Sequence, residues 1–357
     1  MTNYPYMNSV DPLLISQEKI ILSICIATYN RADFIGATIE SIVYQICDGI
    51  EIIIVDGASP DNTQQVVLNY QKNFPQIKYY RLPEKGGVDR DYCKAIELAN
   101  GTYCWLFTDD DTLNKNAINT VLAAIKTKEY ALIVLNARLC SSDLIHCYRK
   151  KFLNFDSNRE YTGIEEQEQF FSDVANYLSF IGGVIIRHDL WNERNKELYF
   201  GTEFVHVGVV FQKKIDEKIL VISNPFISIR MNNSQWNSRA FRIWIITWPQ
   251  LIWSFSSYSE SSRRNVCPRY PSQNLWKLLY YRAMASYSVS DYKNYIKPYS
   301  NTFFSKILAL IIALLPGVLV NLFFILYASI RRRYWMIEEL IKSRNYFINL
   351  MSRSFFS

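Results

Sequence analysis

Three consecutive carboxylates, Asp109, Asp110 and Asp111, are the residues in this sequence best suited to chemistry. They follow Thr108 at the end of an apolar run, and carboxylates crowded at a buried strand end repel one another unless they share a cation. Their oxygen atoms suit Mg2+ or Mn2+, which take further ligands from substrate phosphates. The motif therefore predicts a divalent-metal site for a phosphate-bearing substrate. The alternative is an acidic turn that caps a helix starting at about Asn114.

A fourth carboxylate, Asp56, ends a second apolar run in the stretch IIIVDGASPDNT. A carboxylate at the carboxyl end of a strand in an α/β sheet commonly hydrogen-bonds a nucleoside, so we expect Asp56 to contact a nucleotide. Asp61, in the next turn, is more typical of a helix N-cap. Gly86 and Gly87 precede another expected helix, where glycines allow the backbone to approach an anion closely.

These residues lie between strands and helices that alternate from residue 20 onward. The apolar runs are continuous rather than alternating, which is typical of strands buried on both faces of a parallel sheet. Ligands of such sheets bind beyond the carboxyl ends of the strands, where the polar segments 28–31, 56–59 and 108–111 occur. The expected strands are 20–28, 51–57, 77–82 and 102–111, and the expected helices between them are 33–47, 61–73 and 88–100.

The regular alternation ends after a helix to about residue 128 and a strand at 131–140. The following polar stretch leads into a mixed segment that we assign to the acceptor side of the site. Its expected elements are a strand at 178–187, a short helix around Trp191, a helix at 205–215 and a strand at 218–230. Residues 238–298 have helical periodicity and many aromatic side chains.

The composition excludes two classes of protein. With 357 residues, 49% hydrophobic and 20% charged, the chain can bury a substantial core and is not intrinsically disordered. A net charge of +6 is too small for a dedicated nucleic-acid binder, so no nucleic-acid partner is expected. Seven cysteines without a CxxC pair, and an N-terminus without a secretory signal, indicate a reducing, cytosolic compartment.

Taken together, the motifs resemble the family 2 nucleotide-sugar-dependent glycosyltransferases, which have the GT-A fold. The resemblance rests on ICIATYNR, IIIVDGASPDNT and a Gly-Gly turn followed by RDYCKAIELANGTYCWLFTDDDTL. GGVDRDYCKAIELANGTYCWLFTDDD, FIGGVIIRHDLW and GTEFVHVGVVFQ look like the abequosyltransferases that add a dideoxyhexose to O-antigen repeat units. The resemblance implies an α/β fold with a GT-A-type open, mostly parallel sheet flanked by helices.

The resemblance also implies a site for a nucleotide diphosphate sugar. It places base and ribose near the first strand and the donor near the Gly-Gly turn. The implied donor-binding residues are Thr28, Tyr29, Asn30, Asp56, Gly86, Gly87, Arg90, Asp109 and Asp110. Mn2+ or Mg2+ would be held by Asp109, Asp110 and Asp111. The family usually shows a DxD or DxDD pattern, so TDDD leaves the register open among these three.

The family is inverting, which implies a carboxylate that deprotonates the acceptor hydroxyl. The family's base lies in an acidic pair ahead of a helix, 80–100 residues beyond the DxD, and the corresponding stretch here is 201–206. Glu203 is therefore the expected base. The pair itself is absent, so Glu203 could instead be a helix-capping residue, and His206 could be the base or orient it.

We therefore expect a metal-dependent glycosyltransferase, and two alternatives stay open. One is a GT-A-fold sugar-binding or polysaccharide assembly protein with impaired catalysis. The other is a nucleotidyltransferase, although no Gly-rich basic loop follows the first strand. The expected regions are an N-terminal extension (1–19), a donor-binding half (20–115), an acceptor-binding half (116–235), a helical aromatic-rich region (236–302) and a membrane-associated segment (303–357).

The segment 307–330 contains no charged residue and is long enough to span a bilayer. Pro316-Gly317 interrupts it, and basic residues lie on both sides, so one span would place one basic cluster outside the cell. This pattern favours a re-entrant hairpin or interfacial element over a single span. The expected acceptor is a lipid-linked polyprenyl saccharide for O-antigen or surface polysaccharide, at the cytoplasmic face of the bacterial inner membrane.

Overall fold

The first four strands are β1 (Leu22–Thr28), β2 (Ile50–Asp56), β3 (Ile77–Arg81) and β4 (Tyr103–Phe107). Three of them, β1, β2 and β4, are fully buried, and their sequences are rich in β-branched or aromatic residues, whereas β3 is partly exposed. β-branched and aromatic side chains pack well on a pleated surface, and strands covered by helices on both sides carry them on both faces. The helices between these four strands are α1 (Ala32–Val43), α2 (Thr63–Gln71) and α3 (Val88–Glu97). The expected alternation is confirmed.

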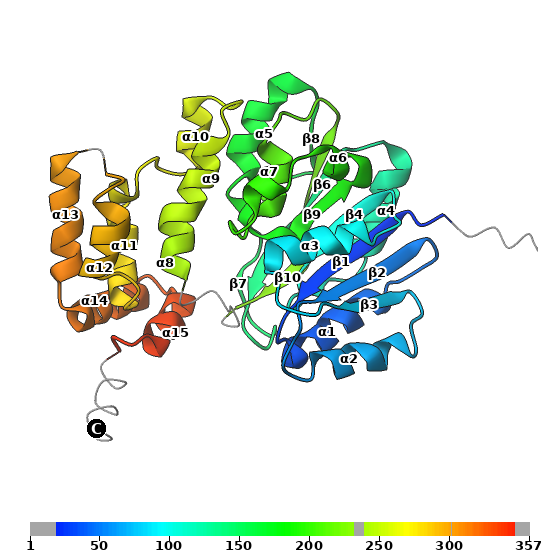
Figure 1. The fold of residues 1–357 in the computed structure, drawn as a ribbon, viewed down its shortest axis with the longest axis horizontal. Helices are drawn as coiled ribbons and strands as arrows, with labels where there is room; N and C mark the ends of the chain where they lie inside the picture. The colour runs from blue at the N-terminus through cyan, green and yellow to red at the C-terminus, as the bar shows by residue number, and fades with distance from the viewer. Residues whose placement is uncertain (1–18, 232–238, 301, 347–357) are drawn as a thin grey trace, which may run out of the picture.

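This computed structural model describes residues 19–231, 239–300 and 302–346. Most of the proposed N-terminal extension, the C-terminal residues 347–357 and the segment 232–238 lie outside the described residues. Figure 1 shows the described chain as an α/β lobe that contains the sheet and a second lobe built from helices.

The remaining elements of the α/β lobe extend the sheet and cover its faces. The added strands are β5 (Thr112–Leu113), β6 (Leu132–Cys140), β7 (Cys147–Arg149), β8 (Arg159–Tyr161), β9 (Val184–Arg187) and β10 (Ile219–Arg230). The added helices are α4 (Ala117–Thr127), α5 (Gln167–Val174), α6 (His188–Glu193) and α7 (Val205–Phe211).

The sheet has the strand order β3-β2-β1-β4-β9-β6-β10-β5. The half made from β1 to β4 is parallel, and β6 and β10 are also parallel to each other. β9 runs antiparallel to both β4 and β6, so it joins the two parallel parts. The carboxyl ends of β1, β2 and β4 meet at one edge, which is where an open α/β sheet binds its ligand.

The segment 178–187 differs from the single strand that its apolar residues predict. Two short 3-10 turns, Tyr177–Ser179 and Ile181–Gly183, precede β9. A Cβ atom on Gly183 would lie 2.6 Å from the carbonyl oxygen of Leu135, so the glycine allows the chain to pass close to β6. Periodicity cannot reveal this close approach between distant segments.

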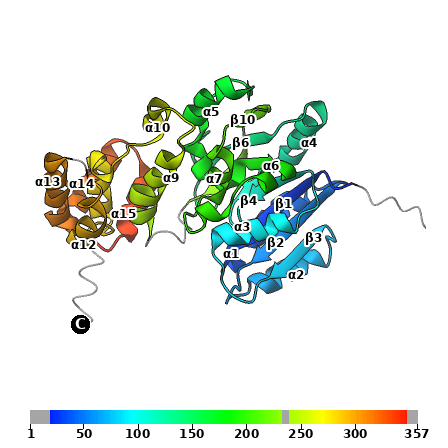
Figure 2. The same ribbon diagram turned by 45° about the horizontal axis from the view of Figure 1, so that its top comes forward.

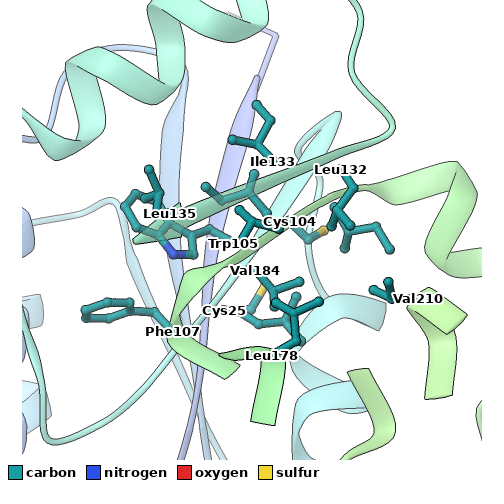
Figure 3. Close-up of a cluster of buried hydrophobic side chains, with 14 of the residues drawn as sticks. Cys25, Cys104, Trp105, Phe107, Leu132, Ile133, Leu135, Leu178, Val184 and Val210 are labelled. Carbon is teal, nitrogen blue, oxygen red and sulfur yellow. The ribbon is translucent and has the colours of Figure 1, made fainter. Parts of the chain in front are cut away.

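The hydrophobic core fills both faces of the sheet. Figure 3 shows part of it, where Cys25, Trp105, Leu132 and Val184 come from neighbouring strands. Trp105 is fully buried, and its indole N–H donates a hydrogen bond to the carbonyl of Gly182 at 2.8 Å. A buried Trp that keeps its polar atom paired adds a large apolar area without a desolvation penalty. The strands that carry the site are therefore anchored in a buried core.

Figure 2 shows the helical lobe beside the α/β lobe. The helical lobe packs around two smaller apolar clusters. It is connected to the α/β lobe by a continuous helical segment from α8 (Ala240–Arg242) through Ile243–Thr247 to α9 (Trp248–Ser254). The helices that follow are α10 (Glu260–Val266), α11 (Leu275–Ala283), α12 (Val289–Asp291), α13 (Phe303–Leu314), α14 (Gly317–Ile330) and α15 (Tyr334–Lys342). Aromatic residues contribute much of the packing, as expected for this region.

The apolar segment 307–330 belongs to two helices rather than one. Among the described residues, no single helix has both the length and the hydropathy of a membrane span. α13 and α14 pass the same test only as a pair, and they meet at an angle of 95°. The bend occurs at Leu315 and Pro316, because proline ends the hydrogen-bond ladder of α13 and then starts α14. We call this helix pair, Phe303–Ile330, the elbow.

Candidate active site

A large cavity opens at the edge of the sheet where β1, β2 and β4 end. Its volume is about 790 Å³, which is within the usual range for small-molecule sites. The ends of β1 and β4, the start of α3 and the loop before α7 line it. The structure brings all the predicted site residues into the cavity wall except Asn30 and Asp56.

The acidic cluster after β4 faces a guanidinium group from the loop after β1. Arg31 contacts Asp109 through Nε at 3.4 Å and Asp110 through an Nη atom at 3.1 Å. The side chains of all three are between 12% and 15% exposed, so the ion pairs are shielded but open to the cavity. Burial, and next the charge of Asp110, raises the pKa of Asp109 to about 7, while Arg31 opposes the rise.

Asp111 is held differently from the other two aspartates. It is 3% exposed, and its carboxylate accepts hydrogen bonds from the Arg230 backbone N–H and the Thr108 hydroxyl, both at 2.7 Å. Burial and the neighbouring carboxylates raise its pKa. Its contacts fix the loop after β4 against β10, which places Asp109 and Asp110 on the cavity side.

The donor set fits a divalent cation that also binds substrate phosphate. Among the described residues, no group of three or more His, Cys, Asp or Glu side chains converges as a complete protein-only site. Mg2+ is usually held by one or two carboxylates plus substrate phosphates, so Asp109 and Asp110 suffice as protein ligands. Burial, and next the charge of Asp110, raises the pKa of Asp109, and a bound cation would oppose both effects by favouring the ionised carboxylate.

The loops after β1 and β3 also line the cavity. Tyr29 contributes its ring, and the ammonium group of Lys85 lies 3.5 Å from the centre of that ring. Gly86 and Gly87 come next, and Gly87 has φ 93°, a conformation that favours glycine. Asn30 has φ 57° and donates its backbone N–H to Ser59, so it turns the β1 loop rather than lining the cavity.

Asp56 is placed behind the cavity wall. It is fully buried, and its carboxylate accepts hydrogen bonds from the Ser59 backbone N–H at 2.7 Å and the Tyr79 hydroxyl at 2.5 Å. Arg81 adds a third contact at 3.3 Å. These contacts tie the loop after β2 to β3. The carboxylate oxygens of Asp56 already have protein partners. The nucleotide contact predicted for Asp56 stays a prediction.

Glu203 lies in a loop that a buried aspartate holds in place. Asp89, in the first turn of α3, accepts backbone N–H bonds from Gly201 at 2.8 Å, Glu203 at 2.9 Å and Val205 at 3.0 Å. Glu203 itself has φ 69°, which is costly for a residue with a side chain. Three hydrogen bonds to one carboxylate compensate this strain and aim Glu203 into the cavity.

The Glu203 carboxylate is nearly enclosed. Its side chain is 9% exposed and forms an ion pair with Arg239. Burial raises its pKa, Asp89 adds to the rise, and the positive charges of Arg239 and Lys85 oppose it. A carboxylate with a raised pKa in a cleft has the properties of a general base, which works best when its pKa approaches the working pH.

His206 also reaches the cavity wall, from the first turn of α7. It is 1% exposed, and its Nε2 lies 2.7 Å from the carbonyl oxygen of Leu178. Burial lowers the pKa of His206 to about 4. The imidazole is therefore neutral near pH 7 and a weak base. Between the two residues predicted for this role, Glu203 has the more suitable environment.

Several site residues were missed by the sequence predictions. Arg31, Asp89, Asp91, Arg230 and Arg239 all line the cavity. The pairing of acids at positions 89 and 91 was a usable signal, but acids in the first turn of a helix are common for electrostatic reasons alone. Arg90, which was predicted to face the donor, lies over the ring of Phe200 at 4.9 Å.

Comparison with known proteins identifies the catalytic lobe. Residues 23–188 match the model of the glycosyl transferase family 2. Abequosyltransferase RfbV of Salmonella typhimurium is 28% identical over 77% of this chain and 86% of its own length. A Campylobacter jejuni enzyme named GalNAc(5)-diNAcBac-PP-undecaprenol beta-1,3-glucosyltransferase is 28% identical over 51% of this chain and 57% of its own.

Solved structures with low sequence identity share the fold. S. aureus TarS 1–349 in complex with UDP-GlcNAc has a TM-score of 0.56 at 15% identity, with 90% of this chain and 89% of that chain covered. Mannosyltransferase PcManGT from Pyrobaculum calidifontis, in complex with GDP-Man and Mn2+, has a TM-score of 0.52 at 12% identity and covers 90% and 84% of the two chains. This chain is therefore a glycosyltransferase whose residues 23–188 match the family 2 model, and its fold is of the GT-A type.

Proposed function

We propose that this glycosyltransferase is metal-dependent and inverting, and that it transfers a sugar from a nucleotide diphosphate to a lipid-linked saccharide. The observation that carries the proposal is that two different carboxylate groups line one cavity. Asp109 and Asp110 contact Arg31, and Glu203 is nearly enclosed and paired with Arg239. A single displacement needs both a group that stabilises the leaving diphosphate and a base that takes the proton of the acceptor hydroxyl.

Each of these residues has a separate role in the reaction. Glu203 takes the proton of an acceptor hydroxyl as that oxygen forms a bond to the anomeric carbon. The bond from the anomeric carbon to the phosphate oxygen breaks, and its electron pair leaves with the nucleoside diphosphate. Asp109 and Asp110 would hold a divalent cation, whose charge would stabilise that diphosphate. Attack and departure on opposite faces of the sugar ring invert its configuration.

The similarity to an abequosyltransferase makes a dideoxyhexose the first donor sugar to test. The relative from Campylobacter jejuni is named for an undecaprenol-linked saccharide, which supports a polyprenyl-linked acceptor for this chain as well. We place the reaction at the cytoplasmic face of the bacterial inner membrane, in O-antigen or surface polysaccharide synthesis.

The elbow supports the membrane part of this proposal. At 1.5 Å per residue its two helices are about 18 Å and 21 Å long, and each is shorter than the roughly 30 Å hydrocarbon layer. α13 buries the small residues Ala309 and Ala313, α14 buries a mixed face that includes Phe324, and both helices expose large apolar side chains. The exposed side chains are Phe303, Phe304, Ile307, Ile311 and Leu314 on α13, and Leu319, Leu322, Phe323, Leu326 and Ile330 on α14.

Basic side chains border these exposed apolar faces. Arg331, Arg332 and Arg333 are exposed after α14, and Lys306 lies near the start of α13. Basic residues near an anionic lipid surface each contribute about 1 kcal/mol to binding. An element that lies in one leaflet keeps both basic ends on the same side, which agrees with the bend of 95°.

The function is tested by the release of nucleoside diphosphate from a panel of nucleotide sugars in the presence of a lipid-linked acceptor. Product analysis by NMR reports the anomeric configuration. Release that requires both the acceptor and Mn2+ or Mg2+, with inversion, supports the proposal. Binding of the nucleotide sugar without any turnover, under all conditions tested, would instead favour a sugar-binding protein on the same fold.

A further inference from the structure

Asp91 is a buried carboxylate in the cavity wall that has no hydrogen-bond or ion-pair partner among the described residues. It is 4% exposed and lines the cavity, its Oδ1 atom is buried without a hydrogen-bond partner, and its Oδ2 atom, which is not among the buried unpaired atoms, accepts no hydrogen bond from the described residues. A buried charge without a partner is costly, so it is retained where a ligand supplies the missing contact. Neither the proposed chemical step nor the fold uses this carboxylate.

The backbone around Asp91 leaves room for its carboxylate. A Cβ atom on Gly57 would lie 2.8 Å from Oδ2, and one on Gly86 would lie 3.0 Å from Oδ1. Gly57 directly follows β2, and Gly86 precedes α3. Glycine at both positions lets the Asp91 side chain sit between the two loops. This arrangement is a built pocket for a carboxylate rather than an accident of one surface loop.

The position of Asp91 relative to the other carboxylates indicates which part of the donor it meets. Asp89 and Asp91 are two residues apart in α3, so their side chains point about 200° apart around the helix. Asp89 holds the Glu203 loop, whereas Asp91 faces the end of β2. Asp91 is therefore on the side of the cavity away from the expected base, and so away from the reacting sugar.

The strand order gives the approximate distance between the ends of β2 and β4. β2 and β4 flank β1, so the end of β2 is about 10 Å from the end of β4 at the usual strand spacing. That separation suits a nucleoside whose diphosphate lies at Asp109 and Asp110. Charge repulsion disfavours a phosphate group of the donor at Asp91, because Asp91 is an anion close to two other carboxylates, Asp56 and Asp89. Lys85 is the positive charge that partly offsets them.

We propose that Asp91 recognises the nucleoside of the donor by accepting a hydrogen bond from a base N–H or a ribose hydroxyl group. Asp56, the carboxylate expected from the family resemblance, already accepts three protein hydrogen bonds and lies outside the cavity wall. Asp91 thus provides a free acceptor where Asp56 does not. This inference rests on the proposed function, because it assumes that the donor is a nucleotide sugar.

The test uses the full-length protein in detergent with Mn2+, titrated calorimetrically with UDP, CDP, GDP and ADP. We expect wild type to bind at least one of them, and Asp91→Asn to weaken that binding about 10- to 100-fold, as for the loss of a hydrogen bond to a charged group. Asp216→Asn is the matched control, because Asp216 is an exposed aspartate away from the cavity. Its affinity should equal that of wild type.

Deoxynucleotides distinguish the two groups that could donate the hydrogen bond to Asp91, a ribose hydroxyl and a base N–H. If a ribose hydroxyl is the donor, removing it from the ligand weakens wild type but leaves Asp91→Asn unchanged. If a base N–H is the donor, Asp91→Asn weakens binding of ribonucleotide and deoxynucleotide equally, and the loss depends on the base. Either pattern supports the proposal.

Three results would overturn it, and they are distinguishable. Equal affinity of wild type and Asp91→Asn for every nucleotide removes the role of Asp91 but leaves the proposed function intact. Absence of nucleotide binding by wild type removes the proposed function and this inference together. Failure of both Asp91→Asn and Asp91→Ser to fold would show that the carboxylate has a structural role instead.

Discussion

Replacing Asp89 with asparagine tests how the loop that carries Glu203 is held. In the wild type one Asp89 oxygen accepts from Gly201 and Glu203, and the other accepts from Val205. The amide nitrogen of asparagine cannot accept a hydrogen bond, so in either rotamer at least one backbone N–H loses its partner. The substitution keeps the shape of the side chain and changes only its capacity as an acceptor.

The magnitude follows from the number and type of these bonds. A buried donor left unpaired costs about 1–3 kcal/mol, and the remaining bonds weaken because the acceptor loses its charge. Burial raises the pKa of Asp89, so removing the charge returns part of this cost. We expect a net destabilisation of about 2–3 kcal/mol, or a fall in Tm of roughly 3–4 °C in a chain of this size. We expect kcat to fall about 10- to 100-fold, because a small displacement of the base is costly.

Differential scanning fluorimetry and steady-state kinetics measure the two effects. Asp91→Asn is the matched control, since both aspartates are 4% exposed and lie in the same turn. Asp89→Asn should lower Tm and kcat with little change in donor affinity, and Asp91→Asn should lower donor affinity without lowering Tm. An Asp89→Asn enzyme with unchanged kcat would refute the idea that Asp89 positions the base.

Four further predictions concern the base, pH and membrane. Glu203→Gln should lower kcat about 10²- to 10⁴-fold with unchanged donor affinity, whereas the same loss in His206→Ala but not in Glu203→Gln would assign the base to His206. Arg239→Ala removes the positive charge beside Glu203, so the pKa of Glu203 should rise and the acidic limb of the pH–rate profile, where Glu203 loses its proton, should shift to higher pH. Burial raises the pKa of Asp91 to about 6, so ionisation of Asp91 destabilises the folded state as pH rises through 6. Asp91→Asn should therefore have a higher Tm than wild type at pH 7.5 but not near pH 4. A difference in Tm that does not change with pH would contradict this. Leu319→Asp with Leu326→Asp should abolish flotation with anionic vesicles, whereas Ile164→Asp, at another exposed apolar position, should not; equal flotation of both variants would remove the elbow as the membrane contact.

The sheet could be predicted from the sequence where local pattern and burial agree. The apolar runs of β1, β2 and β4 are continuous, and the polar residues that follow them do meet at one edge. The break of the elbow was also readable, because Pro316 acts locally on the backbone. By contrast, the antiparallel β9 and the turns at Gly182 and Gly183 depend on contacts with β4 and β6 that no local pattern encodes.

The site, like the sheet, could be predicted from the sequence only in part. Its acidic cluster and the loop of Glu203 were predicted from motif and resemblance, and the structure places both in one cavity. The hydrogen bonds that Asp89 accepts from residues 201–205 join positions more than 100 residues apart, and so does the contact of Arg230 with Asp111. Asp56 was ambiguous for another reason, because its partners on β3 could not be distinguished in advance from a nucleotide.

The most direct test of the central claim is the release of nucleoside diphosphate by one enzyme preparation as the metal is removed and returned. With the preferred nucleotide sugar and a lipid-linked acceptor, we predict that EDTA stops release and that added Mn2+ or Mg2+ restores it. Asp110→Asn should need more metal or show little recovery, while its Tm stays close to that of wild type. Full turnover in EDTA, or an Asp110→Asn enzyme with wild-type rate and metal dependence, would contradict the account.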